Sequence, residues 1–188
     1  MQEYFETIKC DDFEVFNLKY HEDRISRTIG LNINLQEYIY PLTNELLRCK
    51  LIYNESGILN VDFFPYEKRE IKTFKILFDD NIDYSKKYLD RSLLDKLFAK
   101  KEDCDEIIIV RNGIVTDTSI ANIAVFYENQ WIISKESLLE GTTKKRLVLQ
   151  KELILKDITL EMLQNSTKIA LLNAMIGFDI LEDYSFKI

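Results

Sequence analysis

Short runs of β-branched and other apolar residues, each closed by turn residues, dominate the second half of the chain. Residues 106–110 form one run, and Asn112-Gly113 separates it from residues 114–116. An Asn-Gly pair favours two successive positive φ angles, the geometry of a tight turn between antiparallel strands. Similar text continues through 119–127 and 131–133. A hairpin at Asn112-Gly113 followed by further short strands is therefore predicted for this half.

The first half mixes both periodicities. Residues 5–18 alternate apolar and polar around Asp11-Asp12, which predicts a hairpin. Apolar residues at helical spacing predict helices, and alternating text predicts further strands. Over the whole chain, helices are expected at 21–30, 35–47, 92–100 and 143–151. In addition to the strands of the second half given above, strands are expected at 48–53, 58–64, 72–78 and 168–172.

A polar break at 79–83 suggests a division into two lobes, 1–80 and 81–188. The helix expected at 143–151 follows the break at Glu140-Gly141, and a threonine is a suitable cap for it. The chain is thus predicted to be an α+β protein with two lobes.

Composition narrows the kind of partner. The chain has 188 residues, a net charge of -7 and a pI near 4.9, so binding to the phosphate backbone of nucleic acid is not expected. With 46% hydrophobic and 30% charged residues it should fold as an ordinary globular protein. A small metabolite is the expected partner.

The cysteines and the first residues indicate the compartment. Cys10, Cys49 and Cys104 are odd in number and widely separated, so neither a disulfide framework nor a zinc or other metal site is expected. The acidic and aromatic start is unlike a signal peptide, and no apolar run is long enough to span a membrane. We expect a reduced, cytoplasmic protein.

Four segments of the second predicted lobe, 81–188, carry a more specific signal. Residues 112–123, with an acidic residue at Asp117 and an asparagine at Asn122, resemble the signature of the class IV aminotransferase family, the fold-type IV pyridoxal 5'-phosphate (PLP) enzymes. Residues 87–91 are similar to the segment that holds the Schiff-base lysine in the 4-amino-4-deoxychorismate lyases of that family. Residues 139–144 are similar to its Leu-x-Gly-Ile-Thr-Arg phosphate loop, and residues 172–175 to a late segment of the lyases.

Two segments of the first half resemble the family more weakly, the strand at 5–8 and the His-x-x-Arg element formed by His21 and Arg24. The resemblance implies a small α/β N-terminal lobe and a β-barrel-like C-terminal lobe with flanking helices. It also implies PLP as cofactor, an amino-bearing small molecule as substrate, and a homodimer.

The resemblance gives Lys87 the central role, because a primary amine on a flexible stem can form the Schiff base and then act as acid and base. A solvated surface lysine is the alternative, and Lys86 is the neighbour with which it can be confused. Asp117 is expected at the cofactor's ring nitrogen, where a carboxylate keeps that nitrogen protonated. Its alternative is a turn aspartate.

The phosphate is expected at Thr142 and Thr143, whose N–H groups begin a helix, with Arg24 adding a charged fork. A simple helix cap and a surface arginine are the alternatives. Asn122, Asn173 and Ala174 are expected to bind near the cofactor or to fix loops there, and His21 to be a packed or capping histidine.

Three departures from the family pattern matter. Relatives are expected to have a longer first lobe, Asp117 replaces the usual glutamate, and the phosphate loop has Thr142 and Lys144 where the family has an apolar residue and an arginine. Because the segments at 87–91 and 172–175 are most similar to lyases, we expect conversion of 4-amino-4-deoxychorismate to 4-aminobenzoate and pyruvate. An aminotransferase acting on branched-chain or D-amino acids, and a PLP-binding protein without turnover, remain as alternatives.

Overall fold

The computed structural model describes residues 1–188, and their contacts group them into two units. Residues 1–68 and 86–90 form the first unit, and residues 69–85 and 91–188 form the second. This grouping differs from a single cut after residue 80. The reason is pairing: the segment 86–90 bonds to the first strand of the chain, and the strand at 73–78 pairs inside the second unit.

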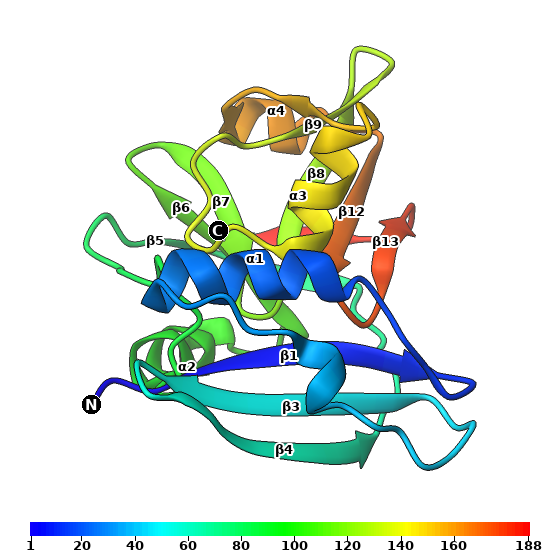
Figure 1. Ribbon diagram of the computed structural model, residues 1–188. Helices are drawn as coiled ribbons and strands as arrows, with labels where there is room; N and C mark the ends of the chain where they lie inside the picture. Colours follow the sequence, from blue (N-terminus) through cyan, green and yellow to red (C-terminus); the bar gives the residue numbers. More distant parts are fainter. The chain divides into compact units, whose positions relative to one another are not determined.

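The first unit is a four-stranded antiparallel sheet with a helix. Its strands run in the order β2-β1-β3-β4, and helix α1 lies across the sheet (Figure 1). The elements are β1 (Tyr4–Asp11), β2 (Glu14–Val15), α1 (Leu18–Ile29), the 3-10 turn η1 (Leu35–Glu37), β3 (Leu47–Asn54) and β4 (Gly57–Pro65). The predicted hairpin, helix and two strands are confirmed, and Gly30 ends α1 with φ 77°, as a left-handed C-cap requires.

Strand β1 separates two different faces of this sheet. Its even-numbered residues Tyr4, Glu6, Ile8 and Cys10 are buried, and apolar residues of α1 pack against the same core. Its odd-numbered residues point to the other face, because side chains alternate along a strand. Glu6 is thus a carboxylate at a core position.

The helix predicted at 35–47 is wrong. Only residues 35–37 form a turn of 3-10 helix, and β3 already begins at Leu47. Pro41 lacks an N–H group and disfavours the α conformation in the residue before it, so a helix cannot continue through this point. Leu35 and Ile39 are buried as a helical pattern suggests, but Leu42 is 87% exposed.

The second unit contains a mixed ten-stranded sheet and three helices. Its main strand path is β10-β9-β8-β7-β6-β5-β14; in addition β11 pairs with β7, β12 pairs with β8, and β13 pairs with β12. The helices are α2 (Ser92–Phe98), continued by η2 (Ala99–Lys101), α3 (Thr142–Leu149) and α4 (Leu160–Gln164). The strands are β5 (Thr73–Phe78), β6 (Glu106–Arg111), β7 (Ile114–Thr118), β8 (Asn122–Tyr127), β9 (Gln130–Ile133), β10 (Ile154–Leu155), β11 (Ile158–Thr159), β12 (Lys168–Asn173), β13 (Gly177–Leu181) and β14 (Ser185–Lys187).

The β6–β7 hairpin confirms the prediction from Asn112-Gly113, since these residues have φ values of 51° and 78°. The chain then turns a corner between β7 and β8, which share one paired position, Asp117 with Asn122. Strand β8 continues between β9 and β12. Asp117 and Asn122, two of the predicted site residues, therefore lie at the corner that joins two parts of the sheet.

Helix α3 begins one residue earlier than predicted, at Thr142. Its N-cap is Gly141 in an extended conformation, with no side-chain cap hydrogen bond, so the prediction of a threonine cap is wrong. No helix of the structure is long and apolar enough to cross a membrane.

Candidate active site

Lys87 is held by a backbone ladder along β1. The carbonyl oxygen of Lys87 accepts from the N–H of Phe5 at 3.0 Å, and the N–H of Leu89 donates to Glu3 at 3.0 Å. The ammonium nitrogen of Lys87 lies 4.5 Å from the centroid of the Phe5 ring. The side chain of Lys87 therefore lies on the same face of the sheet as the odd-numbered residues of β1, beside the ring of Phe5.

Lys86 lies on the other side of this segment. Its Nζ donates to the carbonyl oxygen of Thr28 at 3.0 Å, near the end of α1, and lies 5.5 Å from the Tyr4 ring centroid. Tyr4 belongs to the core face of β1. The contact with a helix carbonyl gives Lys86 a structural role, which supports the assignment of the Schiff base to Lys87.

Arg24 and His21 bind a residue that the sequence analysis missed, Glu6. Nε of Arg24 donates to Glu6 Oε1 at 2.8 Å, Nη2 donates to Oε2, and His21 Nδ1 lies 2.6 Å from Oε2. All three side chains are buried. The reading of Arg24 as a surface arginine is therefore wrong, and the expectation of a packed histidine is confirmed.

The charges of this buried cluster follow from its contacts. Burial alone would raise the pKa of Glu6, but the charge of Arg24 and the hydrogen bonds from His21 and Arg24 outweigh it and bring that pKa to about 2. Burial lowers the pKa of His21, and the charges of Arg24 and Lys87 act in the same direction, against Glu6. Glu6 is thus ionised and His21 neutral near pH 7, with the His21 proton on Nδ1.

The second unit presents Asp117 and Asn122 at the β7–β8 corner. Nδ2 of Asn122 donates to Asp117 Oδ1 at 2.6 Å and to the carbonyl of Leu139 at 2.9 Å, while the N–H of Leu139 donates to Asp117 Oδ2 at 2.9 Å. This closed set of hydrogen bonds fixes the segment that leads into α3. Asp117 is not a simple turn aspartate, because it is buried in β7.

Burial raises the pKa of Asp117 to about 6, although the Leu139 and Asn122 hydrogen bonds and the charge of Lys144 act to lower it. The ionised form of a buried carboxylate with a raised pKa is stabilised by a cationic or strongly donating neighbour. A protonated ring nitrogen is such a neighbour, and each oxygen of a carboxylate can accept more than one hydrogen bond.

The start of α3 is shaped for close approach. A Cβ atom on Gly141 would lie 2.1 Å from Oδ1 of Asn122, so only glycine fits there. The first backbone bond of the helix runs from the N–H of Lys145 to the carbonyl of Gly141, and the N–H groups of Thr142 and Thr143 precede it. The first turn carries no carboxylate. These two residues, both buried, suit an anion such as a phosphate group.

Lys144 does not share this role. Its Nζ donates to the carbonyl of Ser134 at 2.6 Å and to Oγ of Ser137 at 2.5 Å, and burial lowers its pKa despite the opposing charge of Asp117. The side chain therefore anchors the loop after β9. The hydrogen bonds of Lys144 thus run to the segment 134–137, whereas the N–H groups of Thr142 and Thr143 are not among its partners.

Asn173 and Ala174 lie where β12 turns into β13. Oδ1 of Asn173 accepts from the N–H groups of Met175 and Ile176 at 2.9 and 3.1 Å, and its Nδ2 donates to the carbonyl of Ile120 at 3.3 Å. Asn173 thus fixes its own turn and the loop that follows Asp117. Ala174 contributes backbone to that turn.

Two further residues hold the same loop and were missed by the sequence analysis. Nη2 of Arg91 donates to the carbonyl of Ser119 at 3.0 Å, and Glu106 Oε1 accepts from the N–H of Ser119 at 3.2 Å. Burial raises the pKa of Glu106. No sequence motif marks these contacts, because they depend on which strands become neighbours.

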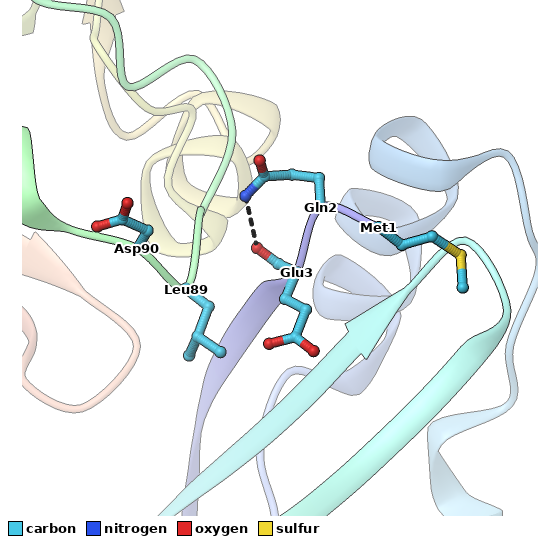
Figure 2. Close-up of a pocket in the computed structure, with 5 residues that line it drawn as sticks. All are labelled: Met1, Gln2, Glu3, Leu89 and Asp90. Carbon is cyan, nitrogen blue, oxygen red and sulfur yellow. Dashed lines mark hydrogen bonds between the residues drawn. The ribbon is translucent and has the colours of Figure 1, made fainter.

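A hollow of about 570 Å³ lies in the first unit, lined by Met1, Gln2, Glu3, Leu89 and Asp90 (Figure 2). One of its lining residues, Leu89, lies two residues after Lys87 in the sequence. Its charged side chains are the carboxylates of Glu3 and Asp90. The candidate site rests on the residues described above and not on this hollow.

Comparison with known proteins identifies the fold and the family of this chain. A crystal structure from Haemophilus somnus 129pt, of a protein provisionally described as a 4-amino-4-deoxychorismate lyase, matches with a TM-score of 0.86 and 37% identity over 94% of this chain and 98% of the other. A PLP-bound form of an aminotransferase from Mycobacterium tuberculosis, whose function is hypothetical, matches with a TM-score of 0.74 and 16% identity, over 99% of this chain and 84% of that one. The fold is thus that of the fold-type IV enzymes.

The family model of amino-transferase class IV matches residues 86–179. An uncharacterized protein from Haemophilus influenzae is 33% identical over 94% of this chain and 100% of its own length. The chain belongs to the class IV aminotransferase family. The expectation that relatives have a longer first lobe does not hold for the two Haemophilus proteins, since this chain covers 98% and 100% of their lengths.

Proposed function

We propose that this protein is a PLP-dependent lyase that converts 4-amino-4-deoxychorismate to 4-aminobenzoate and pyruvate. The observation that carries the choice of reaction is the 37% identity, over 94% of the chain, with the Haemophilus somnus protein described provisionally as such a lyase. The chemistry rests on Lys87, Asp117 and the start of α3.

The residues present fit the cofactor. Thr142 and Thr143 offer N–H groups and hydroxyls to a phosphate at a helix start with no carboxylate in its first turn. Gly141 allows the close approach of the chain to Asn122. Arg24 is a second candidate for the phosphate, already oriented by Glu6. Within the second unit, Asn122 fixes the segment before α3 and Asn173 fixes the loop after Asp117, while Ala174 contributes backbone to the turn after β12.

When bound, PLP withdraws electrons from the amine-bearing carbon of a substrate. The Lys87 amine receives the proton from that carbon and can return it elsewhere on the substrate. The carboxylate of Asp117 keeps a proton on the ring nitrogen by its charge and hydrogen bonding. Aromatisation of the substrate ring drives the elimination of pyruvate.

One assay tests the reaction. Purified protein saturated with PLP is given 4-amino-4-deoxychorismate without any 2-oxo acid, and 4-aminobenzoate and pyruvate are measured. We expect equal amounts of both products over many turnovers, because elimination needs no amino acceptor. The variant Lys87→Ala should form neither product, and Lys86→Ala serves as the matched control that retains activity.

An aminotransferase is the second candidate, supported by the family description and by the aminotransferase structure of the same fold. It should stop after one half-reaction until a 2-oxo acid is added. Sustained exchange between leucine or alanine and a 2-oxo acid, with no 4-aminobenzoate, would replace the lyase proposal. A PLP-binding protein without turnover should do neither. We further propose that the protein works as a homodimer.

A further inference from the structure

The odd-numbered face of β1 carries a group of cations around one aromatic ring. Cross-strand pairing places Phe5 beside Ile52 and Thr7 beside Lys50, so these four side chains share the face opposite α1. The ammonium nitrogen of Lys50 lies 5.8 Å from the Phe5 ring centroid, and that of Lys87 lies 4.5 Å from the same centroid. Two ammonium groups thus border a single buried phenyl ring.

The other charged groups of this face are engaged elsewhere. Lys9 forms an ion pair with Asp11 at 3.1 Å, and the guanidinium of Arg48 stacks 5.2 Å from the Phe64 ring centroid. Asp62, the cross-strand partner of Lys50, accepts a hydrogen bond from Asn60 at 2.6 Å. The half-buried Lys50 has the Phe5 ring as its contact and forms no ion pair.

A half-buried ammonium without a carboxylate is unusual in a chain of net charge -7. Such a group is partly desolvated already, so it gains more from an incoming carboxylate than a fully hydrated lysine does. Its place beside the same ring as the reacting amine puts that carboxylate on the molecule being transformed at Lys87.

We propose that Lys50 binds a carboxylate of the substrate and selects ring compounds that carry two carboxylates over those that carry one. This inference rests on the proposed function, which makes Lys87 the reacting amine. It adds a specificity residue from β3 that no sequence motif marks. It also separates the dicarboxylate substrate from the monocarboxylate product 4-aminobenzoate, which lacks one of the anionic groups and is held less tightly.

Binding of two inert probes tests the proposal without turnover. Isophthalate and benzoate differ by one carboxylate, and their affinities for the PLP-loaded protein are measured by calorimetry. The wild type should prefer isophthalate by roughly 10-fold or more, as expected for a hydrogen bond between charged groups. Lys50→Gln should remove most of this preference and Lys50→Arg should keep it. Lys19→Gln is the control, because Lys19 is an exposed lysine 5.0 Å from the Tyr20 ring centroid.

Turnover gives an independent readout. With 4-amino-4-deoxychorismate, Lys50→Gln should raise KM roughly 10-fold and change kcat little, since the contact is made equally before and during the reaction. Equal binding of both probes by the wild type, or an unchanged preference in Lys50→Gln, overturns the inference even if the lyase reaction is found. A preference that depends on Lys50, with no 4-aminobenzoate formed, sustains the inference and rejects the lyase reaction alone.

Discussion

Neighbouring lysines 86 and 87 have different surroundings, although the sequence offers little to tell them apart. Lys86 donates to the end of α1, whereas Lys87 lies beside Phe5 on the opposite face of β1. The family resemblance alone selects Lys87, and the alternation of side chains along β1 supplies a physical reason for the same choice.

Borohydride reduction of the PLP-loaded protein, followed by peptide mass analysis, should place a pyridoxyl group on Lys87. Lys86→Ala should be labelled to the same extent as the wild type, because the Lys86 amine of the wild type is bonded to the backbone carbonyl of Thr28 and is not expected to react. A label on Lys86 would show an error of one residue in the assignment. No label on either lysine would remove the basis for PLP chemistry.

Glu6 should be worth far more to stability than an exposed carboxylate with an arginine partner. Glu6→Gln leaves Arg24 buried without a full counter-charge and should lower the free energy of unfolding by about 3–5 kcal/mol at pH 7. Asp23→Asn removes the exposed partner of Arg27, 43% and 44% accessible, and should cost about 0.5 kcal/mol or less. Chemical denaturation of both variants measures the difference.

The same pair predicts an acid dependence. Because the pKa of Glu6 falls from its ordinary value of 4.5 to about 2 in the folded state, its stabilising contribution is complete above pH 4.5 and is lost as the pH falls towards 2. The stability gap between the wild type and Glu6→Gln should therefore narrow over this range. A gap that stays constant down to pH 2 contradicts the ionised cluster.

A sequence motif can single out a residue by its neighbours in the chain, but it cannot reveal a residue whose importance comes from tertiary contacts. The motifs single out Lys87, Asp117 and Thr142, and their roles at the cofactor stay predictions. Glu6 could have been suspected as the one carboxylate among the inward-facing positions of an alternating strand. Lys50 could not, since its role depends on the register between β1 and β3.

At the scale of elements, the start of α3 shows how strands and helix are joined. Asp117 and Asn122 come from the β7–β8 corner, and both bond Leu139 just before the helix. The sequence predicted the strands and the helix, because apolar periodicity is a local signal, but it did not predict the corner between β7 and β8. It misplaced the cap, since the close approach of Gly141 to Asn122 is set by tertiary contact.

Gly141→Ala should therefore disturb α3 although Gly141 has an ordinary φ of −67°. The new Cβ would meet an amide that two hydrogen bonds hold in place, and we expect a loss of about 1–3 kcal/mol in stability together with weaker PLP binding. Gly177→Ala is the contrasting variant, with φ 66° and open space around a Cβ, so its cost should be backbone strain alone. Unfolding curves and PLP titration by absorbance would distinguish them. Equal PLP affinity in both variants contradicts a role for this approach in the phosphate site.

Other elements show where local signals run out. Most strands of five or more residues were located correctly because they carry β-branched runs between turn residues, but β13 was not expected. Strands β10 and β11 have two residues each and give no periodicity to detect. The failed helix at 35–47 shows that two buried apolar residues at the right spacing do not outweigh a proline.

At the scale of the whole molecule, the two units are interleaved in sequence, since residues 69–85 belong with the second and 86–90 with the first. A cut at a polar break cannot reveal this, because membership is decided by strand pairing. Two crossings between the units flank the segment that bears Lys87. The backbone position of Lys87 is therefore set by the first unit.

We expect a homodimer in solution, as the family resemblance implies. Light scattering at micromolar concentration should report about twice the chain mass of 22.3 kDa. In the first unit, Tyr40 is 62% exposed and Leu42 is 87% exposed. Burial of such side chains favours association. A particle of single chain mass that turns over substrate at the same concentration rejects the dimer.

The even-numbered and odd-numbered side chains of strand β1 face different surroundings. Glu6 and Ile8 face the core under α1, and Phe5 and Thr7 face Lys50. Systematic mutagenesis of this strand should therefore give two interleaved profiles: cellular abundance falls most at even positions, and ligand recognition changes at odd positions, with Phe5 affecting both because its ring is buried. A single inserted or deleted residue exchanges the two faces and should destroy both functions together.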